Sequence, residues 1–204
     1  MKDFLTIRDG IFRHEFVVEK SRFISFACRV STVEQANFFI ADVSKKHYDA
    51  THNCYAFVTA ESRKFSDDGE PQGTAGLPIL GAIQGKGLEN VAVVVTRYFG
   101  GIKLGAGGLV RAYGKAAAEV LEEAEKVRVL ACVAAEIKCD YSLVSAVETV
   151  CRDKGKILSR DYGAEVVYRA AVPEKRVDAF VKQLNDMTQG RALCEFVDAI
   201  MTEF

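Results

Sequence analysis

The chain of 204 residues is 49% hydrophobic and 27% charged, with a formal net charge of −1, which is the composition of a globular protein. Its length suits one large domain or two modest ones, and it shows neither a long apolar run nor a charged-then-apolar leader, so we expect no membrane span and no secretion signal. The six cysteines are scattered without a C-x-x-C pair, which favours buried free thiols in a cytoplasmic protein over a zinc site.

Strand and helix patterns alternate from the beginning of the chain. Two strands in succession are predicted across Ile11 to Val30, where apolar residues alternate with polar ones. Ser31 and Glu34 have the spacing of a capping box, in which each side chain satisfies a free backbone N–H group of the other's residue. This spacing predicts a helix, and the apolar positions between Ala36 and Val43 form its buried stripe.

The next predicted strand, 51–59, carries His52 and Cys54 on the same face. A cysteine and a histidine at this spacing could form a nucleophile pair, but no third group is evident that would orient the histidine. Residues two apart on a strand commonly share a face, so we favour strand neighbours without a catalytic role.

A polar stretch punctuated by glycine and proline, 63–78, predicts a loop. It contains three carboxylates, Asp67, Asp68 and Glu70, and Thr74 is placed to cap the short helix that follows. The spacing of the carboxylates is not that of a calcium loop, which needs more ligands at alternate positions. We therefore favour an acidic turn that supports the basic loop described next over a metal site.

The centre of the chain concentrates positive charge beside glycine. Val91–Val95 is an unbroken apolar run, which predicts a strand buried on both faces, and a helix is predicted to begin at about Gly107. No acidic residue lies between Asn90 and Ala118, whereas four basic ones do. The N–H groups of a first helical turn bind anions, especially beside cations. The candidate nucleic-acid or phosphate site is therefore Arg97, Tyr98, Lys103, Gly105, Gly107, Gly108 and Arg111.

Two roles stay open for the basic residues of this site. Arg97, Lys103 and Arg111 can bind a ligand, or they can form structural ion pairs with the acidic loop. Phe99, with its neighbours on the strand, can offer a stacking surface to an exposed base. The glycines match neither a P-loop nor a dinucleotide-binding fingerprint, so no nucleotide cofactor is predicted.

Strand patterning restarts at Val127, after the charged connector 122–126. From there the order of predicted elements is β-α-β-β-α-β, which is that of a ferredoxin-like domain. We therefore predict an α+β protein of two domains, 1–126 and 127–204, each with a core of its own.

Two stretches resemble the Impact family: Ser66–Gly76, which reads SDDGEPQGTAG, and Val94–Tyr113, which reads VVTRYFGGIKLGAGGLVRAY. The strand at 50–56 is similar too, and the two-domain layout resembles the bacterial branch of the family, the YigZ type. The resemblance implies a first domain with the fold of the second domain of ribosomal protein S5 and a ferredoxin-like second domain. It further implies a link to the regulation of translation, and it transfers no catalytic residue.

We therefore predict a non-catalytic protein that binds RNA, a ribosome or a translation factor through the basic glycine-rich loop, without a cofactor. Neither predicted domain is strongly basic, so non-specific binding to duplexes should be weak. Two alternatives stay open. One is an enzyme that acts on a phosphorylated small molecule, with Asp67, Asp68 or Glu70 on Mg²⁺. The other is a module that only binds another protein.

Overall fold

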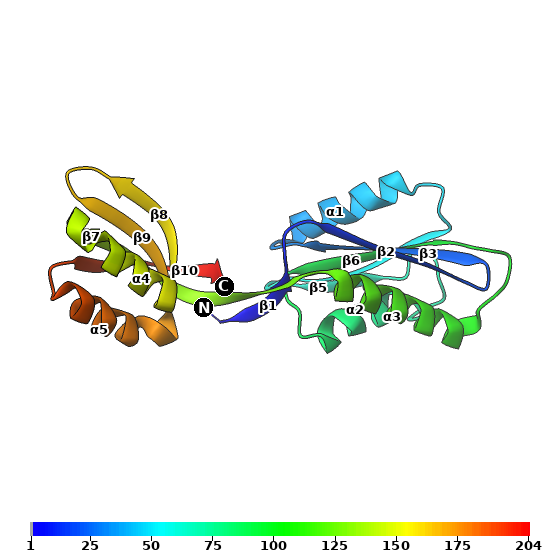
Figure 1. The fold of residues 1–204 in the computed structure, drawn as a ribbon. Coiled ribbons are helices and arrows are strands. Elements are labelled where there is room, and N and C mark those ends of the chain that lie inside the picture. Colours follow the sequence, from blue (N-terminus) through cyan, green and yellow to red (C-terminus); the bar gives the residue numbers. More distant parts are fainter. Residues whose placement is uncertain (1) are drawn as a thin grey trace. The chain divides into compact units, whose positions relative to one another are not determined.

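The computed structural model describes residues 2–204 (Figure 1). The chain divides into one unit of Phe4–Val127 and a second unit of Arg128–Phe204, which also includes the described residues before Phe4. Each unit combines helices with an antiparallel sheet and has a hydrophobic core of its own. The predicted fold class, an α+β protein with two domains, is confirmed. In the part of the chain described, no helix is both long enough and apolar enough to cross a membrane.

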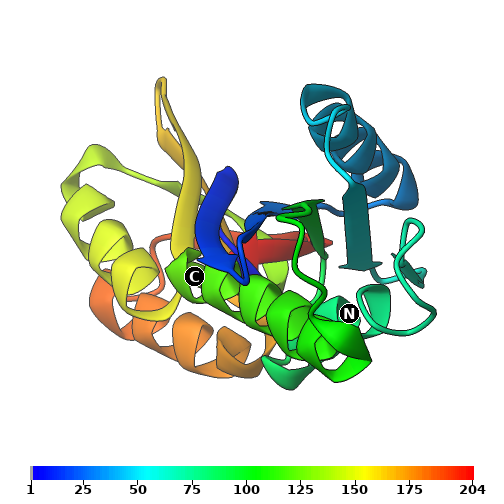
Figure 2. The ribbon, with the colours of Figure 1, turned by 90° about the vertical axis from the view of Figure 1, so that its right-hand side faces the viewer.

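The first unit is built on a five-stranded antiparallel sheet in the order β2-β3-β6-β4-β5. Helices α2 and α3 pack on one face of this sheet and α1 packs on the other (Figures 1 and 2). The elements of this unit are β1 (Phe4–Ile7), β2 (Ile11–Val18), β3 (Ser21–Arg29), α1 (Val33–Lys46), β4 (His52–Val58), β5 (Arg63–Ser66), α2 (Gly76–Gly85), β6 (Val91–Tyr98) and α3 (Gly105–Glu123).

The central strand β6 is buried on both faces, as its apolar run predicts. Val91, Val93 and Val95 pack into the core beneath α2 and α3, whereas Ala92 and Val94 pack against α1. Side chains alternate along a strand, so this pattern also assigns a face to every residue that follows on β6.

The N-cap of helix α1 lies one residue after Ser31, the N-cap that the predicted capping box requires. This N-cap is Thr32, whose Oγ1 accepts a hydrogen bond from the backbone N–H of Gln35 at 3.2 Å. The side chain of Gln35 accepts one from the N–H of Ser31 at 2.7 Å. The sequence offers two overlapping frames of the motif, and Thr32 is the residue with the extended backbone that an N-cap needs.

In the second unit, four strands pair in the order β10-β7-β9-β8, and each of these pairs is antiparallel. Helices α4 and α5 supply apolar side chains to its core, which is formed with β7 and β9. The element order β-α-β-β-α-β is that of the expected ferredoxin-like fold. The elements are β7 (Lys126–Cys139), α4 (Val144–Lys154), β8 (Lys156–Tyr162), β9 (Val166–Pro173), α5 (Val177–Thr188) and β10 (Leu193–Glu203), with short 3₁₀ turns before each helix.

We propose that 127–204 folds as an independent domain, because its apolar cluster is formed among its own strands and helices. The fragment 127–204 should melt cooperatively. Its circular dichroism spectrum should show the helices and strands that this part of the chain forms in the intact protein. The fragment lacks Asp3, which bonds the backbone of Ala131 and the side chain of Lys175, so its melting temperature should be lower than that of the intact unit. A shorter fragment, 140–204, lacks β7 and should be molten. A molten 127–204 would show that the two cores depend on each other.

Candidate functional site

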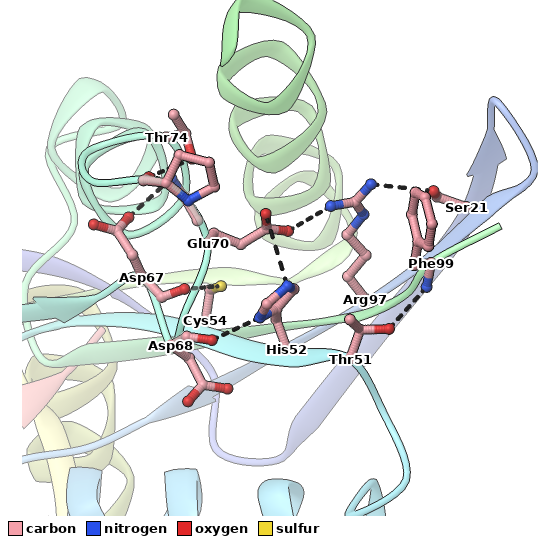
Figure 3. A network of polar contacts seen from close by, with 12 residues as sticks. Ser21, Thr51, His52, Cys54, Asp67, Asp68, Glu70, Thr74, Arg97 and Phe99 are labelled. Atoms are coloured by element: carbon pink, nitrogen blue, oxygen red, sulfur yellow. Dashed lines mark hydrogen bonds and ion pairs between the residues drawn. The ribbon is translucent and has the colours of Figure 1, made fainter. Parts of the chain in front are cut away.

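The alternation along β6 carries Arg97 into the layer beneath α2 and α3, where the residue is only 5% exposed. Its Nη1 donates to Glu70 Oε1 at 2.7 Å and its Nη2 donates to Ser21 Oγ at 3.3 Å (Figure 3). The Cζ atom lies 5.6 Å from the centroid of the Phe23 ring and 5.3 Å from that of Phe99. Arg97 Nε has no hydrogen-bond partner among residues 2–204. Two roles were open for Arg97, ligand binding and ion pairing with the acidic loop, and the structure shows the ion pair.

Glu70 is the centre of a buried polar cluster. Tyr113 on α3 donates its hydroxyl to Glu70 Oε1 at 2.7 Å, and His52 Nε2 lies 3.8 Å from Glu70 Oε2. Burial, reinforced by the neighbouring Cys54 and Glu70, raises the pKa of Tyr113, so the phenol stays protonated and acts as a donor. The carboxylate is therefore held by a guanidinium and a hydroxyl, the arrangement that stabilises a buried charge.

His52 and Cys54 share a face of β4, as predicted, and each is engaged by the acidic loop (Figure 3). His52 Nδ1 donates to the carbonyl of Asp68 at 2.7 Å, and Cys54 Sγ donates to the carbonyl of Asp67 at 2.9 Å. Burial raises the pKa of Cys54 to about 12. Since the thiolate is the nucleophilic form, a thiol held protonated in this way is unreactive at neutral pH.

The carboxylate of Asp67 binds the start of helix α2 rather than the basic loop. Its two oxygens accept hydrogen bonds at 2.8–3.0 Å from the backbone amides of Gly73, Ala75 and Gly76. The expectation that Thr74 caps this helix is wrong, because its hydroxyl turns back to the carbonyl of Pro71 at 2.6 Å. A charged group with two acceptor oxygens reaches several free amides at once, which a hydroxyl does not.

Asp68 also serves the backbone, since its Oδ2 accepts a hydrogen bond from the N–H of Asn53 at 2.6 Å. The acidic loop that we treated as one group therefore has three separate roles: Asp67 caps α2, Asp68 ties the loop to β4, and Glu70 pairs with Arg97. Within residues 2–204 no cluster of three or more His, Cys, Asp or Glu side chains is placed to hold a metal ion.

Replacing Asp67 with asparagine should destabilise the protein by about 1–3 kcal/mol, because the amide of the new side chain is a weaker acceptor for the start of α2. Burial raises the pKa of Asp67, but the three backbone hydrogen bonds outweigh burial and hold it below its ordinary value of 3.8. The carboxylate thus stabilises the fold above that value, and this contribution is lost as the pH falls through the lowered pKa.

Urea unfolding of the wild type and of Asp67→Asn, at pH 7 and at a pH well below the ordinary value of 3.8, measures this contribution. The difference between the two proteins should shrink in acid. A difference that stays constant with pH would show that the carboxylate charge is not the stabilising feature.

Helix α3 begins at Gly105, two residues before the position that its sequence predicts. Gly105 has a φ of 71°, a left-handed conformation that glycine adopts without strain and that turns the chain directly from the loop into the helix. The residue before it, Leu104, makes no side-chain cap, and the first turn holds no acidic residue. The N–H groups of this turn thus keep their capacity to bind an anion.

The glycine-rich loop also has a packing reason. A Cβ atom on Gly100 would lie 2.0 Å from the carbonyl of Lys20, so only glycine lets the loop approach the turn between β2 and β3 so closely. Within the first turn of α3, a Cβ atom on Gly108 would lie 2.9 Å from Leu104 Cβ, whereas Gly107 has no such close neighbour. Close packing therefore accounts for the glycines at positions 100 and 108.

Two hollows lie at the start of α3 and share Lys103. The first, which we call the basic groove, has a volume of about 560 Å³. Three cations, Lys103, Arg111 and Lys115, and one carboxylate, Glu19, line it together with the end of β2. The second, the Arg97 cavity, has a volume of about 340 Å³ and is lined by Lys103, Gly105, Phe99 and the Arg97–Glu70 pair. Lys103 and Arg111 are exposed and form no ion pair within residues 2–204.

Tyr98 does not join the other candidate residues. It follows Arg97 on β6 and therefore points to the opposite face, where its hydroxyl bonds Asp49 at 3.1 Å and His47 at 2.9 Å. A larger cavity of about 670 Å³ lies beside α1 and contains none of the predicted site residues. Apolar side chains, three carboxylates and Arg29 are among the groups that line it. The structure thus gathers Lys103, Gly105, Gly107, Gly108 and Arg111, with Arg97 beneath them.

Comparisons with known proteins agree on one family. Residues 19–121 match the Impact N-terminal domain, and residues 137–191 match a domain of unknown function, DUF1949. The chain is 42% identical to the IMPACT family member YvyE of Bacillus subtilis, over 88% of this chain and 84% of that protein. It is 38% identical to the IMPACT family member YigZ of Escherichia coli, over 85% of this chain and 88% of that protein.

A solved structure, described only as that of a hypothetical protein, matches this fold with a TM-score of 0.63 and 34% identity, and covers 97% of this chain and 98% of its own. Similarity of this extent in both sequence and fold spans the two domains together. The chain therefore belongs to the Impact family, as a two-domain protein of the type represented by YigZ and YvyE.

Proposed function

We propose that the protein is a cytoplasmic, non-catalytic binding protein that associates with RNA or the ribosome and contributes to the regulation of translation. The observation that carries this proposal is the pair of exposed cations, Lys103 and Arg111, which have no ion-pair partner within residues 2–204 and flank the uncapped start of α3. Cations beside free backbone amides bind phosphate. Membership of the Impact family supports the link to translation.

The charge distribution favours a local phosphate site over a broad basic surface. The 27 basic residues of the chain are balanced by 28 acidic ones, so the chain as a whole does not attract a polyanion. Lys115 extends this groove along α3, and its Nζ lies 4.7 Å from the centroid of the Phe16 ring. Binding should therefore involve a short stretch of RNA and depend less steeply on salt than the binding of a strongly basic protein.

The alternative of an Mg²⁺-dependent enzyme has less support. Asp67, Asp68 and Glu70 would be its metal ligands, but each already accepts hydrogen bonds from backbone amides, from Arg97 or from Tyr113. No specific observation favours a second function, and a pure protein-interaction module remains an outcome of the following experiment.

The proposal is tested by sedimenting the purified protein with ribosomes through a sucrose gradient, with and without ribonuclease. Fluorescence anisotropy with a labelled single-stranded RNA of mixed sequence measures direct binding. We expect RNA-dependent recovery in the ribosome fractions and an affinity that falls as salt rises. Recovery that ribonuclease does not change would indicate a protein partner instead, and absence of binding in both assays would refute the proposal.

A further inference from the structure

The Arg97 cavity and the basic groove differ in chemistry although they meet at Lys103. In the cavity the charge of Arg97 is compensated by Glu70, and apolar side chains, including Leu104 and Leu109, form much of the wall. A compensated charge in apolar surroundings attracts an anion weakly. The cavity therefore suits a neutral group, whereas the groove beside it suits a phosphate.

Arg97 forms a rigid part of the cavity wall. Two of its nitrogens are held by Glu70 and Ser21, so the guanidinium has a fixed orientation (Figure 3). Its Nε has no partner within residues 2–204, although the residue is 95% buried and lines the cavity. The Nε atom is itself shielded from solvent, and the guanidinium lies over the rings of Phe23 and Phe99, so Arg97 is a fixed part of the wall and not a free donor.

Phe99 supplies a flat apolar surface at the same place. The residue is 45% exposed although it borders the cavity, and Figure 3 shows it beside Arg97. A hydrogen bond joins its backbone N–H to Thr51 Oγ1 at 3.0 Å and fixes the position of the backbone. An exposed aromatic ring on an anchored backbone is the element on which proteins stack unpaired bases.

We propose that the Arg97 cavity accepts one unpaired nucleobase of an RNA strand whose phosphate lies in the basic groove at Lys103. The base stacks on the exposed part of the Phe99 ring, and the apolar wall formed by Leu104 and Leu109 encloses it. The volume of about 340 Å³ lies at the lower end of the range for small-ligand sites. This inference rests on the proposed function, and it specifies that the ligand is single-stranded, because a base paired in a duplex cannot enter the cavity.

Three probes separate the base from the phosphate: a labelled single-stranded RNA of mixed sequence, the same strand annealed to its complement, and inorganic polyphosphate as a competitor. Phe99→Ala should weaken the binding of single-stranded RNA about tenfold, because stacking is lost, and should leave the binding of polyphosphate within about twofold. A 2-aminopurine base in the strand should be quenched on binding to the wild type and not on binding to Phe99→Ala.

A second variant tests the cavity without changing Phe99. Ala106 is exposed and lines the cavity, so Ala106→Leu should fill it while Phe99 stays in place, and it should reproduce the same selective loss. The matched control is Phe38→Ala, which removes another exposed phenylalanine of the same unit, outside the cavity, and should change neither affinity.

The outcomes distinguish this inference from the proposed function. Full affinity for single-stranded RNA in folded Phe99→Ala and Ala106→Leu would overturn the base site while the phosphate site stands. Equal losses for RNA and polyphosphate would overturn it as well. A wild-type protein that binds neither probe would overturn the proposed function itself, and the base site with it.

Discussion

The double variant Lys103→Ala/Arg111→Ala should bind RNA at least about a hundredfold more weakly than the wild type, with a nearly unchanged melting temperature. Each charge-assisted hydrogen bond to phosphate contributes about 1.5–3 kcal/mol, so the removal of two amounts to roughly two to four decades in affinity. The fold should tolerate the change, since both side chains are exposed and form no ion pair within residues 2–204. Anisotropy titration and a thermal melt measure the two quantities.

The salt dependence of RNA affinity is an independent test of the same variant. For single-stranded RNA, the slope of log affinity against log salt should flatten by about 0.7 for each phosphate that the variant no longer neutralises. The matched control, Lys45→Ala/Lys64→Ala, removes the same net charge from exposed positions of the same unit outside the groove. It should change affinity several-fold at most. A folded double variant that binds as the wild type does would show that the groove is not the phosphate site.

The change Glu70→Ala should destabilise the protein by about 3–5 kcal/mol, because it leaves the buried charge of Arg97 without its partner. The hydroxyl of Tyr113 loses its acceptor at the same time. For a unit of this size, a loss of that order lowers the melting temperature by roughly 10–20 °C. Differential scanning calorimetry and urea unfolding of the full chain measure the effect.

Two further variants identify the cause of that loss. Glu61 is exposed and forms no ion pair within residues 2–204, so Glu61→Ala should stay within about 0.5 kcal/mol of the wild type. Replacing the whole pair, with Glu70→Leu and Arg97→Met together, should recover part of the stability because no unpaired charge remains. A Glu70→Ala variant as stable as Glu61→Ala would show that the buried pair contributes nothing.

Regular patterns in the sequence determined the elements of the fold. The run Val91–Val95 predicts a strand buried on both faces, and the structure places it at the centre of the sheet. The local periodicity of apolar residues indicates which residues become buried. Strands, helices and the α+β class can therefore be predicted without knowledge of contacts. The family was likewise recognisable from Ser66–Gly76 and Val94–Tyr113, because both motifs are contiguous in sequence.

Strand alternation also predicts that Arg97 is buried. Arg97 shares its face of β6 with Val91, Val93 and Val95, so a charged group at this position enters the core and needs a partner. The same alternation separates Tyr98 from it. Residues that are adjacent on a strand therefore lie on opposite faces, however close they are in sequence.

Only the tertiary structure decided which groups meet. The partner of Arg97 is Glu70, 27 residues earlier, and the start of α2 is capped by Asp67 rather than by the nearer Thr74. The cap from Asp67 lies within one loop, and the folded conformation of that loop selects Asp67 over Thr74. The pairing of Arg97 with Glu70 depends on the place of β6 in the sheet and on the packing of α3, which bring distant segments together. The two hollows that share Lys103 arise in the same way, since each is bounded by segments that the fold alone places side by side.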